Sequence, residues 1–244
     1  QPNIMITCGR TDQVNIDIYR EFVDFNEYNY YTKKSIKIIE SLLEKEYFEV
    51  PFYKRKLCWG EEIVFYPFTD ILFKIVCTSD NDTSLQLHPR KNETWYPLKT
   101  TTIFNGKKWI SVPENKKIVI PKCSVHCMKV NGMVFEVQDN SLFDNEETLR
   151  IFDVNGRKID NYLNYVLPHN LNELRIEDYK KNIISDKDIF LFLISGDNYY
   201  GENKLESNKL YFVKKENRKS LKLKGRYIIT PANYIRINEV KEYN

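Results

Sequence analysis

Short apolar runs separated by turn residues recur through the middle of the chain and again near its end. In one of them, Leu85 and Leu87 alternate with Gln86 and His88, which is the two-residue period of a strand with one buried face. Many short strands between turn signals predict an all-β barrel or sandwich. The expected strands are residues 63–65, 71–77, 84–88, 94–98, 109–112, 117–120, 133–137, 189–194, 210–213, 227–230 and 234–237.

One segment near the N-terminus has a helical period instead. Ile36, Ile39, Leu42 and Leu43 follow one another at steps typical of one helix face, and the charged side chains fall largely on the other face. Thr32 can cap such a helix at its N-terminus. The pattern predicts an amphipathic helix that packs on the outside of the sheet.

These patterns divide the 244 residues into four parts. Residues 1–50 form an N-terminal segment with the helix, and residues 51–160 form a first β-barrel. Residues 161–182 form a connector with some helix, and residues 183–244 form a second, smaller β domain. An Asn-Gly pair at 131–132 favours a tight hairpin turn within the first barrel.

Composition points to no macromolecular partner. The chain has 37 Lys plus Arg against 34 Asp plus Glu, so the net charge of +3 favours no particular ligand. Eight basic residues between Lys209 and Arg226 are typical of a solvated hairpin, and nucleic acid is not the expected partner. Five cysteines without framework spacing indicate reduced thiols. With neither a membrane span nor a signal segment recognisable, we expect a soluble cytoplasmic protein.

Possible metal ligands gather around the Gln86–His88 strand. A proline follows His88, so the chain should turn there and return as a neighbouring strand that carries Glu93 back beside the pair. His126 follows another apolar run. Its imidazole, the Gln86 amide, the His88 imidazole and the Glu93 carboxylate could converge. Nitrogen and oxygen donors suit Zn²⁺ and also Fe²⁺, Mn²⁺ or Ni²⁺, and two histidines with one carboxylate also describe an iron oxygenase site.

The spacing of these residues resembles that of the cupins, a family of small β-barrels. Their first motif is Gly, five residues, His, one residue, His, three or four residues, Glu; their second is Gly, five residues, Pro, one residue, Gly, two residues, His. The corresponding residues of this chain are Asp80, Gln86, His88 and Glu93 for the first motif, and Asn115, Pro121, Cys123 and His126 for the second.

A glutamine in the first histidine position narrows the resemblance to type I mannose-6-phosphate isomerases. The motifs that match in order are Trp59-Gly60, Gln86-Leu87-His88-Pro89, Lys91-Asn92-Glu93-Thr94-Trp95-Tyr96, Pro121 to His126, Glu136-Val137-Gln138, Asn140-Ser141, Arg150-Ile151-Phe152-Asp153 and Arg157. The family inserts that enclose the pocket are missing, which predicts a reduced enclosure. Gly225 and Pro231 repeat the second cupin spacing, but Arg236 stands in the place of the metal histidine. A jelly-roll cupin barrel followed by a degenerate, metal-free cupin-like domain is therefore expected.

The resemblance implies a zinc enzyme that interconverts aldose and ketose phosphates through an enediolate. Gln86, His88, Glu93 and His126 would hold the metal. Catalytic roles would fall to Lys91 as a holder of oxyanion or phosphate, Glu136 as the proton carrier and Arg157 as a clamp for the anionic substrate. Two alternatives remain open at this point: a non-catalytic cupin that binds a carbohydrate, and an Fe(II)-dependent oxygenase in the same barrel.

Overall fold

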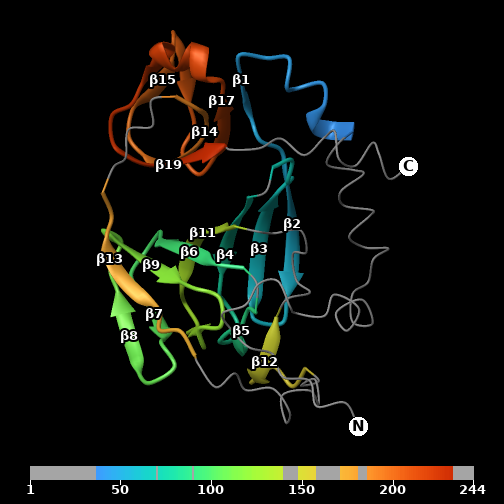
Figure 1. Ribbon diagram of the computed structural model, residues 1–244, viewed down its shortest axis with the longest axis vertical. Helices are drawn as coiled ribbons and strands as arrows, with labels where there is room; N and C mark the ends of the chain where they lie inside the picture. Colours follow the sequence, from blue (N-terminus) through green and yellow to red (C-terminus); the bar gives the residue numbers. More distant parts are fainter. Residues whose placement is uncertain are drawn as a thin grey trace. The chain divides into compact units, whose positions relative to one another are not determined.

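The computed structural model describes residues 37–69, 71–89, 91–139, 148–157, 171–180 and 186–232. They divide into two compact units. The first contains Lys54–Val64 and the described residues of Leu72–Tyr179; the second contains Phe65–Ile71 with the described residues of Asn29–Tyr53 and Lys180–Asn244. Both units are built from antiparallel strands (Figure 1), which confirms the all-β prediction.

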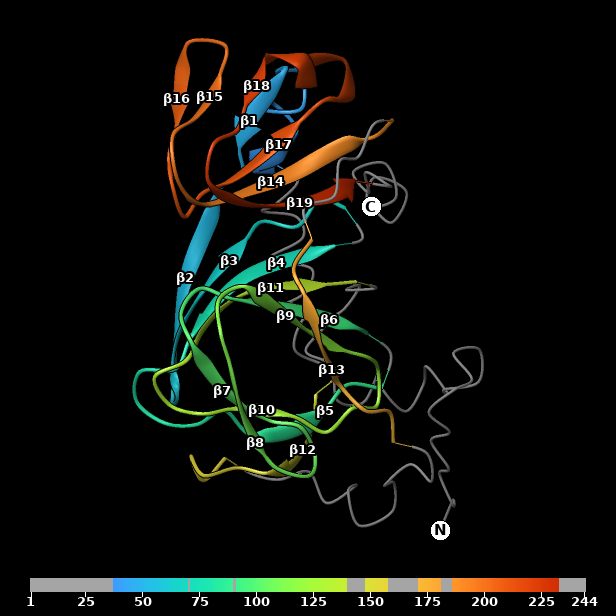
Figure 2. The same ribbon diagram turned by 90° about the vertical axis from the view of Figure 1, so that its left-hand side faces the viewer.

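The described residues of the first unit form three sheets (Figure 2). The largest has the order β13 (Arg175–Asp178), β9 (Lys116–Ile120), β6 (Glu93–Pro97), β11 (Met133–Gln138), β4 (Leu72–Cys77), β3 (Gly60–Phe65) and β2 (Phe52–Leu57). A second sheet has the order β10 (Cys127–Met128), β7 (Thr101–Phe104) and β8 (Trp109–Val112). The third pairs β12 (Leu149–Phe152) with β5 (Leu85–Leu87).

The two-residue strand period sorts the side chains of the large sheet onto two faces. Val134 of β11 belongs to the hydrophobic core between the sheets, and Glu136 and Gln138 follow on the same face at the end of the strand. Phe135 faces the other way and stacks on Phe73. One face of the sheet therefore carries an apolar core and a polar end. The core consists of Trp59, Val76, Trp95, Ile103, Val112, Ile118, Ile120, Met128, Val134 and Leu174.

Strand pairing differs from two of the sequence expectations. β5 does not pair with the strand that follows Pro89; it pairs with β12, whereas β6 lies between β9 and β11. The Asn131–Gly132 turn is present, with Asn131 at a φ of 68°, but it does not close a hairpin. β10 before it pairs with β7, and β11 after it pairs with β4 and β6. In both cases the barrel is closed by pairing between strands that are far apart in the sequence.

The second unit contains a four-stranded and a three-stranded sheet. The four-stranded sheet has the order β1 (Tyr47–Glu49), β17 (Leu210–Val213), β14 (Asp188–Ser195) and β19 (Arg226–Ala232). The three-stranded sheet has the order β16 (Asn203–Leu205), β15 (Asn198–Tyr200) and β18 (Leu221–Lys222). A 3-10 helix, η2, spans Lys215–Ser220. Its core contains Ile189, Leu191, Leu193, Tyr200, Leu205, Tyr211 and Val213. The predicted strand at 234–237, with Arg236, lies outside the described residues.

The predicted N-terminal helix falls partly outside the described residues as well. Among those described, residues 37–39 are helical and a turn follows them. The chain then enters β1, which pairs with β17. Helical periodicity alone overestimated how far the helix extends toward the C-terminus, since residues 40–46 form turns and a bend and Tyr47 already belongs to a strand.

Two further observations concern the cysteines and the membrane. Cys123 is disulfide-bonded, so the expectation of reduced thiols is wrong for this residue. Cys58, Cys77 and Cys127 are free. Within the described ranges, no helix has the length and apolar character that a membrane crossing requires.

Candidate active site

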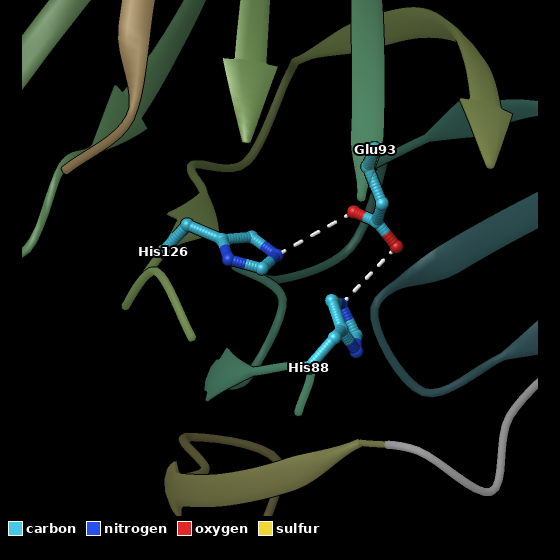
Figure 3. Close-up of side chains that lie close together, drawn as sticks. All are labelled: His88, Glu93 and His126. Atoms are coloured by element: carbon cyan, nitrogen blue, oxygen red, sulfur yellow. Dashed lines mark ion pairs between the residues drawn. The ribbon is translucent and has the colours of Figure 1, made fainter. Parts of the chain in front are cut away.

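Three possible metal donors converge in the first unit. His88 follows β5, Glu93 begins β6, and His126 immediately precedes β10. Their donor atoms all lie within 4.8 Å of one another, and all three residues are buried. The Nε2 atom of His88 is 3.1 Å from Glu93 Oε1, and His126 Nε2 is 3.6 Å from Glu93 Oε2. Both rings face the carboxylate (Figure 3).

Backbone pairing brings the two histidine segments together. Gln86 and His126 form a bridge in which the amide of each residue donates to the carbonyl of the other, at 3.0 and 2.9 Å. Cys123 N donates to His88 O at 2.7 Å, and Cys123 takes the left-handed φ of 62° that a turn glycine would adopt. The segment 123–126 therefore curls around the end of β5 and aims His126 at the same point as His88.

The Nε2 atom of His126 is available to a ligand. His126 Nδ1 lies 2.9 Å from the carbonyl of Ser124, which can only accept, so Nδ1 carries the proton and Nε2 presents a lone pair. That Nε2 atom is buried and has no hydrogen-bond partner among the described residues. Burial, together with the charge of His88, lowers the pKa of His126 to about 4, which keeps the ring in its neutral, ligating form. A cation between this lone pair and Glu93 would satisfy both groups, so the donor set fits a divalent metal.

Glu93 is the centre of the cluster. Trp95 Nε1 donates to its Oε2 at 3.1 Å, while Lys91 Nζ lies 3.4 Å from its Oε1. Burial opposes ionisation, but His88 and Lys91 outweigh it and hold the pKa of Glu93 well below its usual value. The buried carboxylate is therefore ionised and oriented before any ligand arrives.

Gln86 lies at the wall of the same cavity. Its side-chain oxygen accepts a hydrogen bond from Ser84 Oγ at 2.8 Å. An amide oxygen has two lone pairs, so this contact leaves one for a metal. The role of Gln86 as the fourth donor stays a prediction.

A cavity of about 130 Å³ opens beside the cluster. Lys91, Glu136 and Arg157, the three residues expected to be catalytic, all line it. Glu136 is buried, and burial together with the negative charge of Glu93 raises its pKa to about 8. Arg157 is held by Asp153, to which it donates from Nε at 2.5 Å and from Nη2 at 3.3 Å. The structure thus places all the predicted site residues except His126 in the wall of one cavity, and His126 lies beside it.

Several residues of the cavity wall were missed by sequence reasoning. They are Arg55, Glu62 and Lys74, together with Arg150, which lies in a matching motif but was given no role. Lys74 had a signal that could have been used: it is the single charged residue in the apolar run 71–77, and it is almost completely buried in β4. A buried lysine needs a partner, and Lys74 Nζ lies 3.8 Å from Glu62 Oε2.

Comparison with known proteins bears on the fold. The structure superposes on mannose 6-phosphate isomerase from Bacillus subtilis with a TM-score of 0.54 and 12% identity, over 77% of this chain and 98% of that one. The chain has the cupin fold. No protein-family model and no curated protein sequence matches it.

Two other cupin structures are more distant. Oxalate decarboxylase from Bacillus subtilis gives a TM-score of 0.44 at 11% identity, over 70% of each chain. Streptomyces Pac13, a nucleoside dehydratase, gives 0.37 at 11% identity, over 43% of this chain and 92% of that one. The fold assignment therefore depends on the isomerase comparison, with its TM-score of 0.54, and the chemistry has to be argued from the site.

Proposed function

We propose that this protein is a metal-dependent cupin, with zinc as its expected metal, that interconverts aldose and ketose forms of a sugar phosphate or a related sugar. The observation that carries the proposal is the convergence of His88, Glu93 and His126 at the edge of a cavity lined by Lys91 and Glu136. Gln86 would complete the ligand set. The expected setting of this chemistry is the cytoplasm.

The charges around the cavity favour an anionic ligand. Five basic side chains line it, namely Arg55, Lys74, Lys91, Arg150 and Arg157, against the acidic Glu62, Glu93 and Glu136. Glu136 is largely protonated at neutral pH because its pKa is raised to about 8. The remaining excess of positive charge attracts a phosphate or carboxylate group, and arginine offers a fork of donors suited to either.

Glu136 supplies the proton chemistry in this proposal. Isomerisation moves a proton between two neighbouring carbons, and a carboxyl group whose pKa lies near neutral pH can both accept and return it. Lys91 places an ammonium group beside Glu93, where it can bind an oxyanion of the substrate. A bound divalent metal would polarise the carbonyl and stabilise developing negative charge.

Metal analysis with a turnover assay tests the proposal. Purified protein should contain zinc and interconvert mannose 6-phosphate and fructose 6-phosphate. The Glu136→Gln variant should retain zinc and lose turnover. Glu173→Gln serves as the matched control, because Glu173 is exposed on a strand-flanking loop and pairs only with exposed Lys107 among the contacts described. Turnover retained by Glu136→Gln would contradict the assignment of the proton carrier.

A non-catalytic carbohydrate-binding cupin is the second candidate. Lys91 and Arg157 are both engaged, Lys91 with Glu93 and Arg157 with Asp153, which is also what a purely structural role would give. Zinc without turnover of any sugar phosphate, combined with measurable sugar binding, would favour this candidate. Bound iron with an oxygen-dependent product would instead favour an oxygenase.

A further inference from the structure

A single amide lies between the two carboxylates of the site. Gln138 is the last residue of β11, is 2% exposed and is the cross-strand partner of Glu93 in β6. Its Nε2 donates to Glu93 Oε1 at 3.3 Å and also to Glu136 Oε1. Glu136 precedes it by two residues, so both side chains lie on the same face of β11. The two N–H bonds of one amide are thus divided between two acidic groups.

Lys91 fixes the orientation of this amide. Its Nζ donates to Gln138 Oε1 at 3.2 Å, and an ammonium group has no acceptor, so the amide oxygen must face Lys91. The amide nitrogen is therefore obliged to face Glu93 and Glu136. All four side chains, Lys91, Glu93, Glu136 and Gln138, are buried, which makes an unsatisfied group among them costly.

We propose that Gln138 is a positioning residue that holds the metal-binding carboxylate of Glu93 and the proton-carrying carboxylate of Glu136 in a fixed spatial relation. The inference rests on the proposed function for the roles of those two residues. Glu93 is ionised, and placing a second buried acidic group beside it is unfavourable unless donors hold the two apart. Gln138 supplies one donor to each, and so Glu136 stays beside the metal site instead of turning toward Lys74, its neighbour on β4.

Contacts of Glu93 distinguish this role from simple support of a metal ligand. Trp95 also donates to Glu93, from Nε1 to Oε2, but no hydrogen bond joins Trp95 to Glu136 among the described contacts. Loss of the Trp95 donor should loosen Glu93 alone. Loss of the Gln138 amide should loosen both carboxylates.

The test compares Gln138→Met, which keeps side-chain length without the amide, with Trp95→Phe, which keeps an aromatic ring without the donor. Both variants should weaken zinc binding by about 10- to 100-fold, as expected when a group that orients a metal ligand is removed. Zinc affinity is measured by competition with a chelator, and thermal unfolding checks that each variant is folded.

Turnover at increasing zinc separates the two variants. The kcat of Trp95→Phe should rise toward the wild-type value, whereas the kcat of Gln138→Met should stay reduced by about 100-fold with an unchanged KM, because Glu136 is displaced from its working position. Full recovery of kcat in Gln138→Met at saturating zinc would overturn the proposal.

Crystal structures of the zinc-loaded proteins give a readout that does not depend on turnover. Gln138→Met should show the Glu136 carboxylate turned away from Glu93, and Trp95→Phe should show it in place. An unmoved Glu136 in Gln138→Met would also overturn the proposal. If wild-type protein turns over no sugar phosphate, the proposed function fails, while zinc affinity and the position of Glu136 still decide the role of Gln138.

Discussion

Zinc binding should stabilise the folded protein, and His126→Ala should abolish most of that effect. His88, Glu93 and His126 are at most 3% exposed, and their donor atoms meet only in the folded chain. A ligand that binds the native state alone stabilises it by about 2.7 kcal/mol when present at about 100 times its dissociation constant. For a chain of this size each kcal/mol raises the unfolding midpoint by roughly 2–4 °C. Wild-type protein should therefore melt roughly 5–11 °C higher with zinc than with a chelator.

Calorimetry with zinc and with EDTA measures this difference. In His126→Ala one of three donors is missing, so the two melting temperatures should nearly coincide. The control Glu173→Gln, which alters an exposed carboxylate far along the sequence from the donors, should retain the wild-type difference. The reasoning is refuted if zinc leaves the wild-type midpoint unchanged, or if His126→Ala responds to zinc as strongly as the wild type.

Three further variants test the site and its support. Because burial raises the pKa of Glu136 from 4.5 to about 8, the folded chain holds a proton there that the unfolded chain releases. The stability contributed by this proton is present below pH 4.5 and lost as the pH rises through about 8. Urea unfolding at about pH 5 and about pH 8 should then show wild-type protein losing stability relative to Glu136→Gln as the pH rises, and parallel behaviour would refute the assignment. Leu87→Ala leaves a cavity at a fully buried position between Gln86 and His88. It should lower the free energy of unfolding, measured in urea, by about 2–5 kcal/mol. An unchanged urea midpoint would contradict the burial of Leu87 in a packed core. Arg157→Lys loses the forked contact with Asp153. It should raise the KM for a sugar phosphate by about tenfold or more, which corresponds to the loss of one or two charge-assisted hydrogen bonds. An unchanged KM would indicate that Arg157 has a structural role alone.

Local sequence pattern was sufficient for the strands that carry the site. The alternation around Leu85 and Leu87, and the runs at 71–77 and 133–137, gave β5, β4 and β11 nearly to the residue. Side-chain alternation is a local property, because each residue of a strand simply points opposite to the one before it. For the same reason the sequence could place Glu93 and Trp95 on one face, and in the structure Trp95 donates to Glu93.

Chemical type and spacing also selected the residues of the site. Histidine, glutamate and glutamine at cupin intervals identified four possible ligands, and three of them now lie within 4.8 Å. The same reasoning gave no role to Lys74 or Gln138, although Lys74 interrupts an apolar run and Gln138 lies in a matching motif. Their importance comes from partners on other strands, Glu62 for Lys74 and Glu93 for Gln138.

Strand pairing was decided by the tertiary structure alone. Proximity in sequence predicted that β5 would pair with β6 across Pro89, yet β5 pairs with β12 and β6 lies between β9 and β11. The metal donors consequently meet across the barrel from different sheets. Likewise, the Asn131 turn forms locally while its flanking strands pair elsewhere. The alternation of side chains determines which face of a strand is buried. Which strand pairs with which depends on how all the strands together enclose one hydrophobic core, and that is a property of the whole chain.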